Sequence, residues 1–135
     1  MVIFFSDGLE TSEDIMIFRK MLDASVTNNK SAEAYAKATD NIDVSSKPIF
    51  VGFRAMAMMM MCKHAFNPAE KLVFFKKGKS LLEMAIEKER DNVELRYFRF
   101  STQCKLPGIL NYDSNLKEDK LFLLIYLKRE NRSKS

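Results

Sequence analysis

The fold is decided by PIFVGFRAMAMMMMCKHAFNPAE, residues 48–70. Pro48 favours the first turn of a helix, because its missing N–H would have no partner there. The run that follows is apolar nearly all round, which is typical of a helix enclosed by others. Asn67, Pro68 and Glu70 then give a capping side chain, a first-turn proline and a first-turn carboxylate, three signals that a new helix begins. The stretch therefore predicts a buried helix and a second helix joined to it by a short turn.

The same signals extend outward in both directions. Caps, acidic first turns and apolar positions three to four residues apart predict six helices, at about 12–27, 31–42, 48–66, 68–90, 93–104 and 116–127. The first helix is expected to be capped by Thr11 or Ser12, and the second by Ser31. Short connections favour antiparallel neighbours. We therefore expect one all-α domain over residues 1–127, built of antiparallel helical hairpins in a short array or compact bundle, and a flexible basic tail over 128–135.

Composition places the chain among folded globular proteins. Hydrophobic residues make up 47% of the 135 residues and charged residues 30%, outside the range of disordered chains. The net charge of +4 is uneven, since residues 1–46 carry four Lys or Arg against eight Asp or Glu, and residues 47–135 carry eighteen against ten. The basic part predicts attraction to nucleic acid, acidic protein or anionic lipid, or else to the acidic first third of the same chain.

The sequence predicts neither secretion nor a membrane span. Residues 1–7 lack the basic start and the apolar length of a signal peptide. The longest other apolar run, Ala55 to Cys62, is far shorter than the roughly 20 residues of a transmembrane helix. Cys62 and Cys104 are isolated, which predicts reduced thiols. We expect a soluble cytoplasmic protein.

Residues 78–92 resemble part of a tetratricopeptide repeat. Gly78, Leu82, Ala85 and Ile86, followed by a charged exit turn, have the spacing of small and bulky residues of that family's second helix. The resemblance implies a scaffold of helical hairpins that binds peptides or protein surfaces.

Basic side chains on the fourth and fifth helices form the candidate interaction surface. Its residues are Lys76, Lys77, Arg96, Arg99 and Gln103. Aromatic residues interleave with the arginines, and cations beside rings are what single-stranded nucleic-acid binding requires. Neighbours along a helix point in different directions, however. We therefore expect Tyr97 and Phe100 to face the core, and the arginines to face water or pair with the acidic first helices.

Five methionines between residues 56 and 61 leave two interpretations open. Flexible thioethers fill irregular gaps in a core, and they also line adaptable binding grooves. The pattern favours a core role, with a groove as the alternative.

Patterns of catalysis or metal binding do not occur in the sequence. His64 is the single histidine. It lies two residues after Cys62, so on a helix their side chains diverge by about 200° and cannot exchange a proton. Glu83 and Glu87 have the spacing of a water-facing strip. Motifs of nucleotide binding, zinc proteolysis and serine hydrolysis are missing. We expect no enzyme activity, no cofactor and no metal.

These observations favour a non-catalytic protein–protein interaction module or scaffold. A partner peptide would bind between helices by apolar anchors, with lysine or arginine at the rim. A basic nucleic-acid-associated protein is the alternative. A short helical array leaves apolar ends uncovered, so a homodimer is also predicted.

Overall fold

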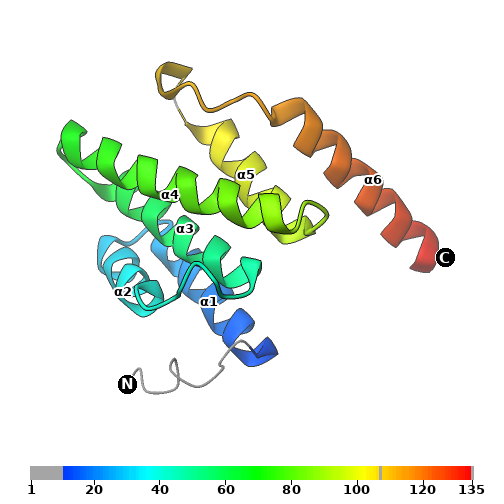
Figure 1. Ribbon diagram of the computed structural model, residues 1–135, viewed down its shortest axis with the longest axis horizontal. Helices are drawn as coiled ribbons and strands as arrows, with labels where there is room; N and C mark the ends of the chain where they lie inside the picture. The colour runs from blue at the N-terminus through cyan, green and yellow to red at the C-terminus, as the bar shows by residue number, and fades with distance from the viewer. Residues whose placement is uncertain (1–10, 107, 135) are drawn as a thin grey trace.

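Six α-helices make up most of the described chain, residues 11–106 and 108–134 of a computed structural model, without the side chain of Ile109 (Figure 1). The elements are α1 (Ser12–Ser25), α2 (Asn29–Thr39), α3 (Pro48–His64), α4 (Pro68–Lys88), α5 (Val93–Lys105), the short 3₁₀ helix η2 (Gly108–Leu110) and α6 (Leu116–Lys134). No strand occurs in these residues. The all-α class predicted from the sequence is confirmed.

Local capping chemistry sets the helix starts. Thr11 caps α1, and its side chain and that of Asp14 accept each other's backbone N–H groups. Asn67 begins α4 by accepting a hydrogen bond from the N–H of Ala69. The predicted cap of the second helix was wrong, because Asn28 takes that position and accepts from the N–H of Ser31. The second helix therefore begins two residues earlier than expected.

The predicted basic tail was also wrong, because α6 continues through Lys134. The hydroxyl of Tyr126 donates to Glu130, one helical turn further on, at 3.1 Å. Ser133 donates back to the carbonyl of Glu130. Residues 128–134 are rich in good helix formers, and basic groups in the last turn complement the helix dipole. Charge density alone did not distinguish this helical end from a frayed tail.

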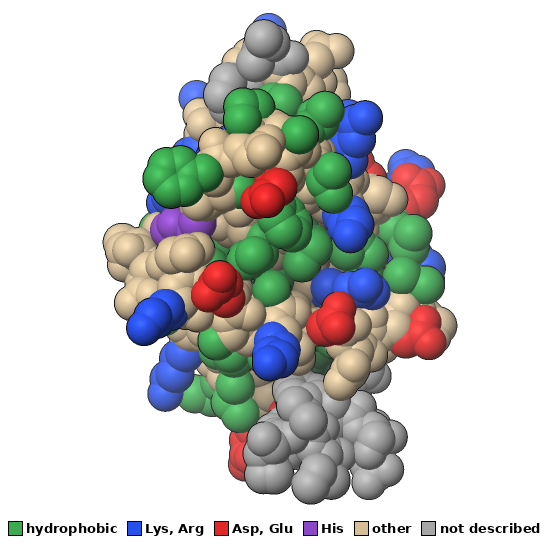
Figure 2. Space-filling view, turned by 90° about the vertical axis from the view of Figure 1, so that its left-hand side faces the viewer, with side chains coloured by type: hydrophobic (Ala, Val, Ile, Leu, Met, Phe, Trp, Pro, Cys, Tyr) green, Lys and Arg blue, Asp and Glu red, His purple; other side chains and the backbone are tan. Residues whose placement is uncertain are grey.

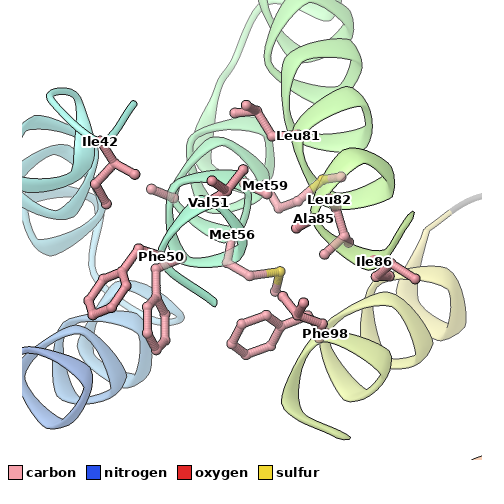
Figure 3. Close-up of a cluster of buried hydrophobic side chains, with 14 of the residues drawn as sticks. Ile42, Phe50, Val51, Met56, Met59, Leu81, Leu82, Ala85, Ile86 and Phe98 are labelled. Carbon is pink, nitrogen blue, oxygen red and sulfur yellow. The ribbon is translucent and has the colours of Figure 1, made fainter. Parts of the chain in front are cut away.

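The apolar helix α3 lies at the centre and packs against α1, α2, α4 and α5. Figure 3 shows how its side chains divide among these neighbours: Phe50 points toward α1, Met59 toward α4, and Met56 toward Phe98 of α5. All four of these side chains are buried. The prediction that this helix is enclosed by the others is confirmed.

A close approach between α3 and α4 requires glycine at position 78. A Cβ atom there would lie 3.0 Å from the Cε of Met59 and 3.1 Å from the backbone oxygen of Ala55. The carbonyl belongs to the helix itself and cannot move aside as a flexible side chain can. Glycine at position 78 therefore lets the two helices pack closely.

The outermost helix, α6, packs only against α5 within the described residues. In Figure 1 it stands apart from α1 to α4. It leaves large apolar side chains exposed, namely Leu121, Leu124, Ile125, Tyr126 and Leu127. Across the described helices, none has an apolar stretch of the length that a membrane span needs.

Candidate interaction groove

The five residues of the predicted interaction surface do not lie on one surface. Lys76 and Lys77 are exposed on α4. Arg96, Arg99 and Gln103 are buried on the side of α5 that faces α6. The expectation that the arginines face water or the first helices was wrong, and Tyr97, expected in the core, is exposed.

The arginines are buried because they share one carboxylate. Asp119 of α6 has no exposed surface. Its Oδ1 accepts from Nε of Arg96 at 2.6 Å and from Nη2 of Arg99 at 2.9 Å, and its Oδ2 accepts from Nε of Arg99 at 2.7 Å. Charge-assisted bonds of this kind are among the strongest in proteins. We call Arg96, Arg99 and Asp119 the arginine clamp, which fastens α6 to α5.

Further polar groups surround the arginine clamp. Nη1 of Arg99 donates to Glu83 of α4 at 2.9 Å, and the hydroxyl of Tyr112 donates to the other oxygen of Glu83. Burial and this hydrogen bond raise the pKa of Tyr112. Burial acts to lower the pKa of Arg99, but its bond to Asp119 and the nearby carboxylates hold it above the ordinary value. Each of these groups has a partner within the protein, so the cluster holds helices together.

The sequence contains a signal for this cluster on α6. Asp119 precedes Phe122 by three residues, so both lie on one side of α6. The guanidinium of Arg96 lies over the ring of Phe122, 4.2 Å from its centre. An acidic residue on the same stripe as an aromatic residue indicates a side of α6 that can pack against the arginine stripe of α5.

The cations named in the nucleic-acid hypothesis do not converge on one open basic face. That hypothesis requires Arg96 and Arg99 to join the lysines without acidic neighbours. Both arginines instead pair with carboxylates. On the face drawn in Figure 2, basic and acidic side chains are interspersed around hydrophobic ones. The sequence predicted that the basic part of the chain would be attracted to the acidic first third. In the described ion pair between these two parts, Arg19 to Glu94 at 2.7 Å, the basic residue instead belongs to the first third.

An apolar groove opens beside α3 at the other side of α5. Its cavity volume is about 730 Å³. The groove is lined by Leu22 and Asp23 of α1 and the adjoining Val26, by Met56, Met59, Met60, Cys62 and Lys63 of α3, by Pro68, Lys71 and Leu72 of α4, by Tyr97, Phe98, Ser101, Thr102 and Lys105 of α5, and by Leu106 and Leu110 after it. We call this the methionine groove.

The methionine groove exists because α1 and α5 both pack on α3 but not on each other. At one end the Arg19–Glu94 ion pair bridges α1 and α5. Toward the carboxyl end of α3 nothing described bridges them, and an apolar side of α3 lines the open space. Met56 and Met59 are buried and Met60 is half-buried. The methionines thus serve both of the roles considered, filling the core and lining a groove.

Few polar groups of the methionine groove are open to a partner. The hydroxyl of Ser101 donates to the carbonyl of Phe98, and that of Thr102 to the sulfur of Met56. Nζ of Lys71 donates to the carbonyls of Cys62 and Lys63 at the end of α3. Lys63 and Lys105 are exposed. The groove therefore offers apolar contact below and positive charge at its edge.

The surroundings of the Cys62 thiol and the His64 imidazole, near the methionine groove, are those of side chains that stabilise the fold. Burial raises the pKa of Cys62, which favours the thiol over the nucleophilic thiolate. His64 contacts the carbonyl oxygen of Ser25 through Nε2 at 2.7 Å, which joins the ends of α3 and α1. Within the described part of the chain, no three His, Cys, Asp or Glu side chains come together as a metal site.

Comparison with protein-family models, curated proteins and solved structures gave no match to the chain. The resemblance of residues 78–92 to a tetratricopeptide repeat therefore stays a prediction. The regular hairpin array that it implies stays one as well.

Proposed function

We propose that this chain is a non-catalytic protein-interaction module, and that the methionine groove is its docking site. The observation that carries the proposal is the apolar gap between α1 and α5 over the methionine side of α3. A cavity of this volume falls within the range of typical binding pockets. Its lining gives a partner apolar side chains to bury against.

The chemistry of the lining favours a protein partner. Methionine side chains are flexible and polarisable, so they adapt to anchors of different shapes. Tyr97 stands exposed at the groove, and tyrosine is enriched where protein surfaces meet. Apolar anchors with lysine at the rim are also the mode expected from the sequence.

Nucleic acid is supported less well. The arginine clamp removes two of the cations on which that alternative depends. Lys76 and Lys77 remain exposed, but phosphate binding gains its strength from many cations acting together.

Two neighbouring residues of α4 provide a matched test. Leu72 lines the methionine groove and is 42% exposed, whereas Val73 lies outside its lining and is 51% exposed. Proteins captured by the wild-type chain would be compared with those captured by Leu72→Gln, by Val73→Gln and by the double variant Lys76→Ala, Lys77→Ala. Circular dichroism would check that each variant is folded.

We expect a partner that is lost with Leu72→Gln and retained with the other two variants. A set of captured proteins that is unchanged by Leu72→Gln but lost with the lysine variant would contradict the groove as docking site. Loss of that set after nuclease treatment would favour the nucleic-acid alternative.

A further inference from the structure

The hydrogen bonds of the methionine groove restrict the backbone of any segment that enters it. The hydroxyls of Ser101 and Thr102 in its lining are paired within the protein, that of Tyr97 belongs to an exposed side chain, and no described strand offers an open edge. An extended peptide would leave its own N–H and C=O groups without partners there, which costs free energy for each buried group. An α-helix satisfies these groups internally and presents only side chains. The groove therefore suits a helix.

The charges at the methionine groove restrict the residues beside the anchors. Three lysines belong to its lining, Lys63, Lys71 and Lys105, against one carboxylate, Asp23. Lys71 is tied to the end of α3, but its charge stays beside the cavity. Complementary charge steers a partner to the site and disfavours partners of the wrong sign. Acidic residues next to the apolar anchors fit this edge, and basic ones would be repelled.

We propose that the docking segment is an amphipathic α-helix from a partner protein, with apolar anchors on one side and Asp or Glu beside them. This rests on the methionine groove being a docking site at all. Anchors at positions i, i+3 or i+4, and i+7 of such a helix lie within about two turns, roughly 11 Å of helix. The groove supplies the apolar surface for them, and Lys63 and Lys105 face the acidic flank.

A display selection tests the nature of the segment without knowledge of the natural partner. The full chain would be screened against a library of random 16-residue peptides, without bias toward helix or charge. Binding of the enriched peptides would be measured by fluorescence anisotropy to the wild type, to Leu72→Gln and to Val73→Gln. A second groove variant, Ser101→Trp, fills the space with a large side chain. The serine hydroxyl that it removes makes only a hydrogen bond within α5.

We expect enriched peptides with helical apolar spacing and acidic flanks, weakened at least tenfold by either groove variant and unchanged by Val73→Gln. Peptides that depend on the groove but contain central prolines or basic flanks would overturn this inference and leave the proposed function standing. Peptides that bind both groove variants as well as the wild type, or a failure to enrich any peptide, would overturn both.

A charge swap tests the acidic flank separately. The double variant Lys63→Glu, Lys105→Glu changes two exposed side chains that no described ion pair uses. We expect it to weaken acidic-flanked peptides by roughly tenfold and to gain affinity for the same peptides with Lys in place of Glu. Equal affinity of the swapped protein for both peptides would contradict a role of the lysines in recognition.

Discussion

Two guanidinium groups share the carboxylate of Asp119, which has no exposed surface. If one partner of a buried ion pair is removed, the other charge stays buried without compensation. Arg96 would then keep a hydrogen bond to the carbonyl of Arg90 at 2.6 Å and, as its one carboxylate, the exposed Glu118 at 3.4 Å. Arg99 would keep Glu83 of α4 at 2.9 Å. The stability of the α5–α6 contact therefore depends on a single aspartate.

We expect Asp119→Ala to lower the free energy of unfolding by about 3–5 kcal/mol, because it leaves the two buried arginines without their shared partner. Urea denaturation followed by circular dichroism measures the loss. Glu118→Ala is the matched control, since its side chain is 61% exposed and exposed pairs contribute about 1 kcal/mol or less. Equal losses for the two variants would contradict the importance of the arginine clamp.

Two buried tyrosines predict sensitivity to alkaline pH. Burial raises the pKa of Tyr35 and of Tyr112, and Glu83 adds to the effect at Tyr112. Above pH of about 10 the unfolded chain releases phenolic protons that the folded chain retains, so stability falls as the pH rises. We expect Tyr112→Phe to lessen the fall between pH 9 and pH 11, measured by urea denaturation at each pH. The same change at the exposed Tyr97 should leave the fall as in the wild type; if Tyr112→Phe also leaves it unchanged, the prediction is wrong.

Among the helices, most starts could be predicted from the sequence, but the helices against which each one packs could not. Asn67 and Asn92 cap α4 and α5 through hydrogen bonds within three residues along the chain, so the local sequence contains all the needed chemistry. The stripe of Arg96, Arg99 and Gln103 was also recognised as one side of a helix. That side packs against α6 through contacts to Asn115 and Asp119, 12 to 23 residues further along the chain. Helical periodicity does not predict such contacts.

The methionine groove shows the same limit. The apolar character of residues 48–62 predicted burial, and a groove was considered as the alternative. Its walls come from Leu22 of α1 and from Tyr97 and Ser101 of α5, far apart in the sequence. The space exists because α1 and α5 do not contact each other. The distance between these two helices is set by how whole helices pack on α3.

The close contact between α3 and α4 determines how a substitution at Gly78 affects stability. A glycine-to-alanine change in an exposed helix interior stabilises by about 1 kcal/mol. At Gly78 we expect the opposite sign, a loss of about 1–3 kcal/mol, because the new methyl group meets the carbonyl of Ala55. Ser80→Ala, at an exposed position two residues further along α4, is the control and should be neutral or slightly stabilising. Thermal unfolding of Gly78→Ala at or above the wild-type midpoint would count against the close approach.

In the whole molecule, the exposed apolar side chains of α6 are a candidate contact surface for the homodimer predicted from the sequence. Leu121, Leu124 and Ile125 are exposed and lie three to four residues apart, so they form an apolar patch on one side of α6, and such patches mark sites of association. If copies associate through this patch, Leu124→Glu should return the protein to a monomer while keeping its helical content. Sedimentation velocity over a range of concentrations measures this. A wild-type protein that stays monomeric at high concentration would contradict the homodimer.

We propose that partners dock in the methionine groove and not on the basic residues of α4 and α5. Methyl NMR of the protein labelled with ¹³C at its methionines tests it directly, because Met56, Met59 and Met60 line the groove whereas Met16 and Met84 are exposed outside it. On addition of a peptide selected against the full chain, we expect shifts of the three groove methyl signals, with those of Met16 and Met84 unchanged. Shifts at Met16 or Met84 with the groove signals unmoved would contradict it.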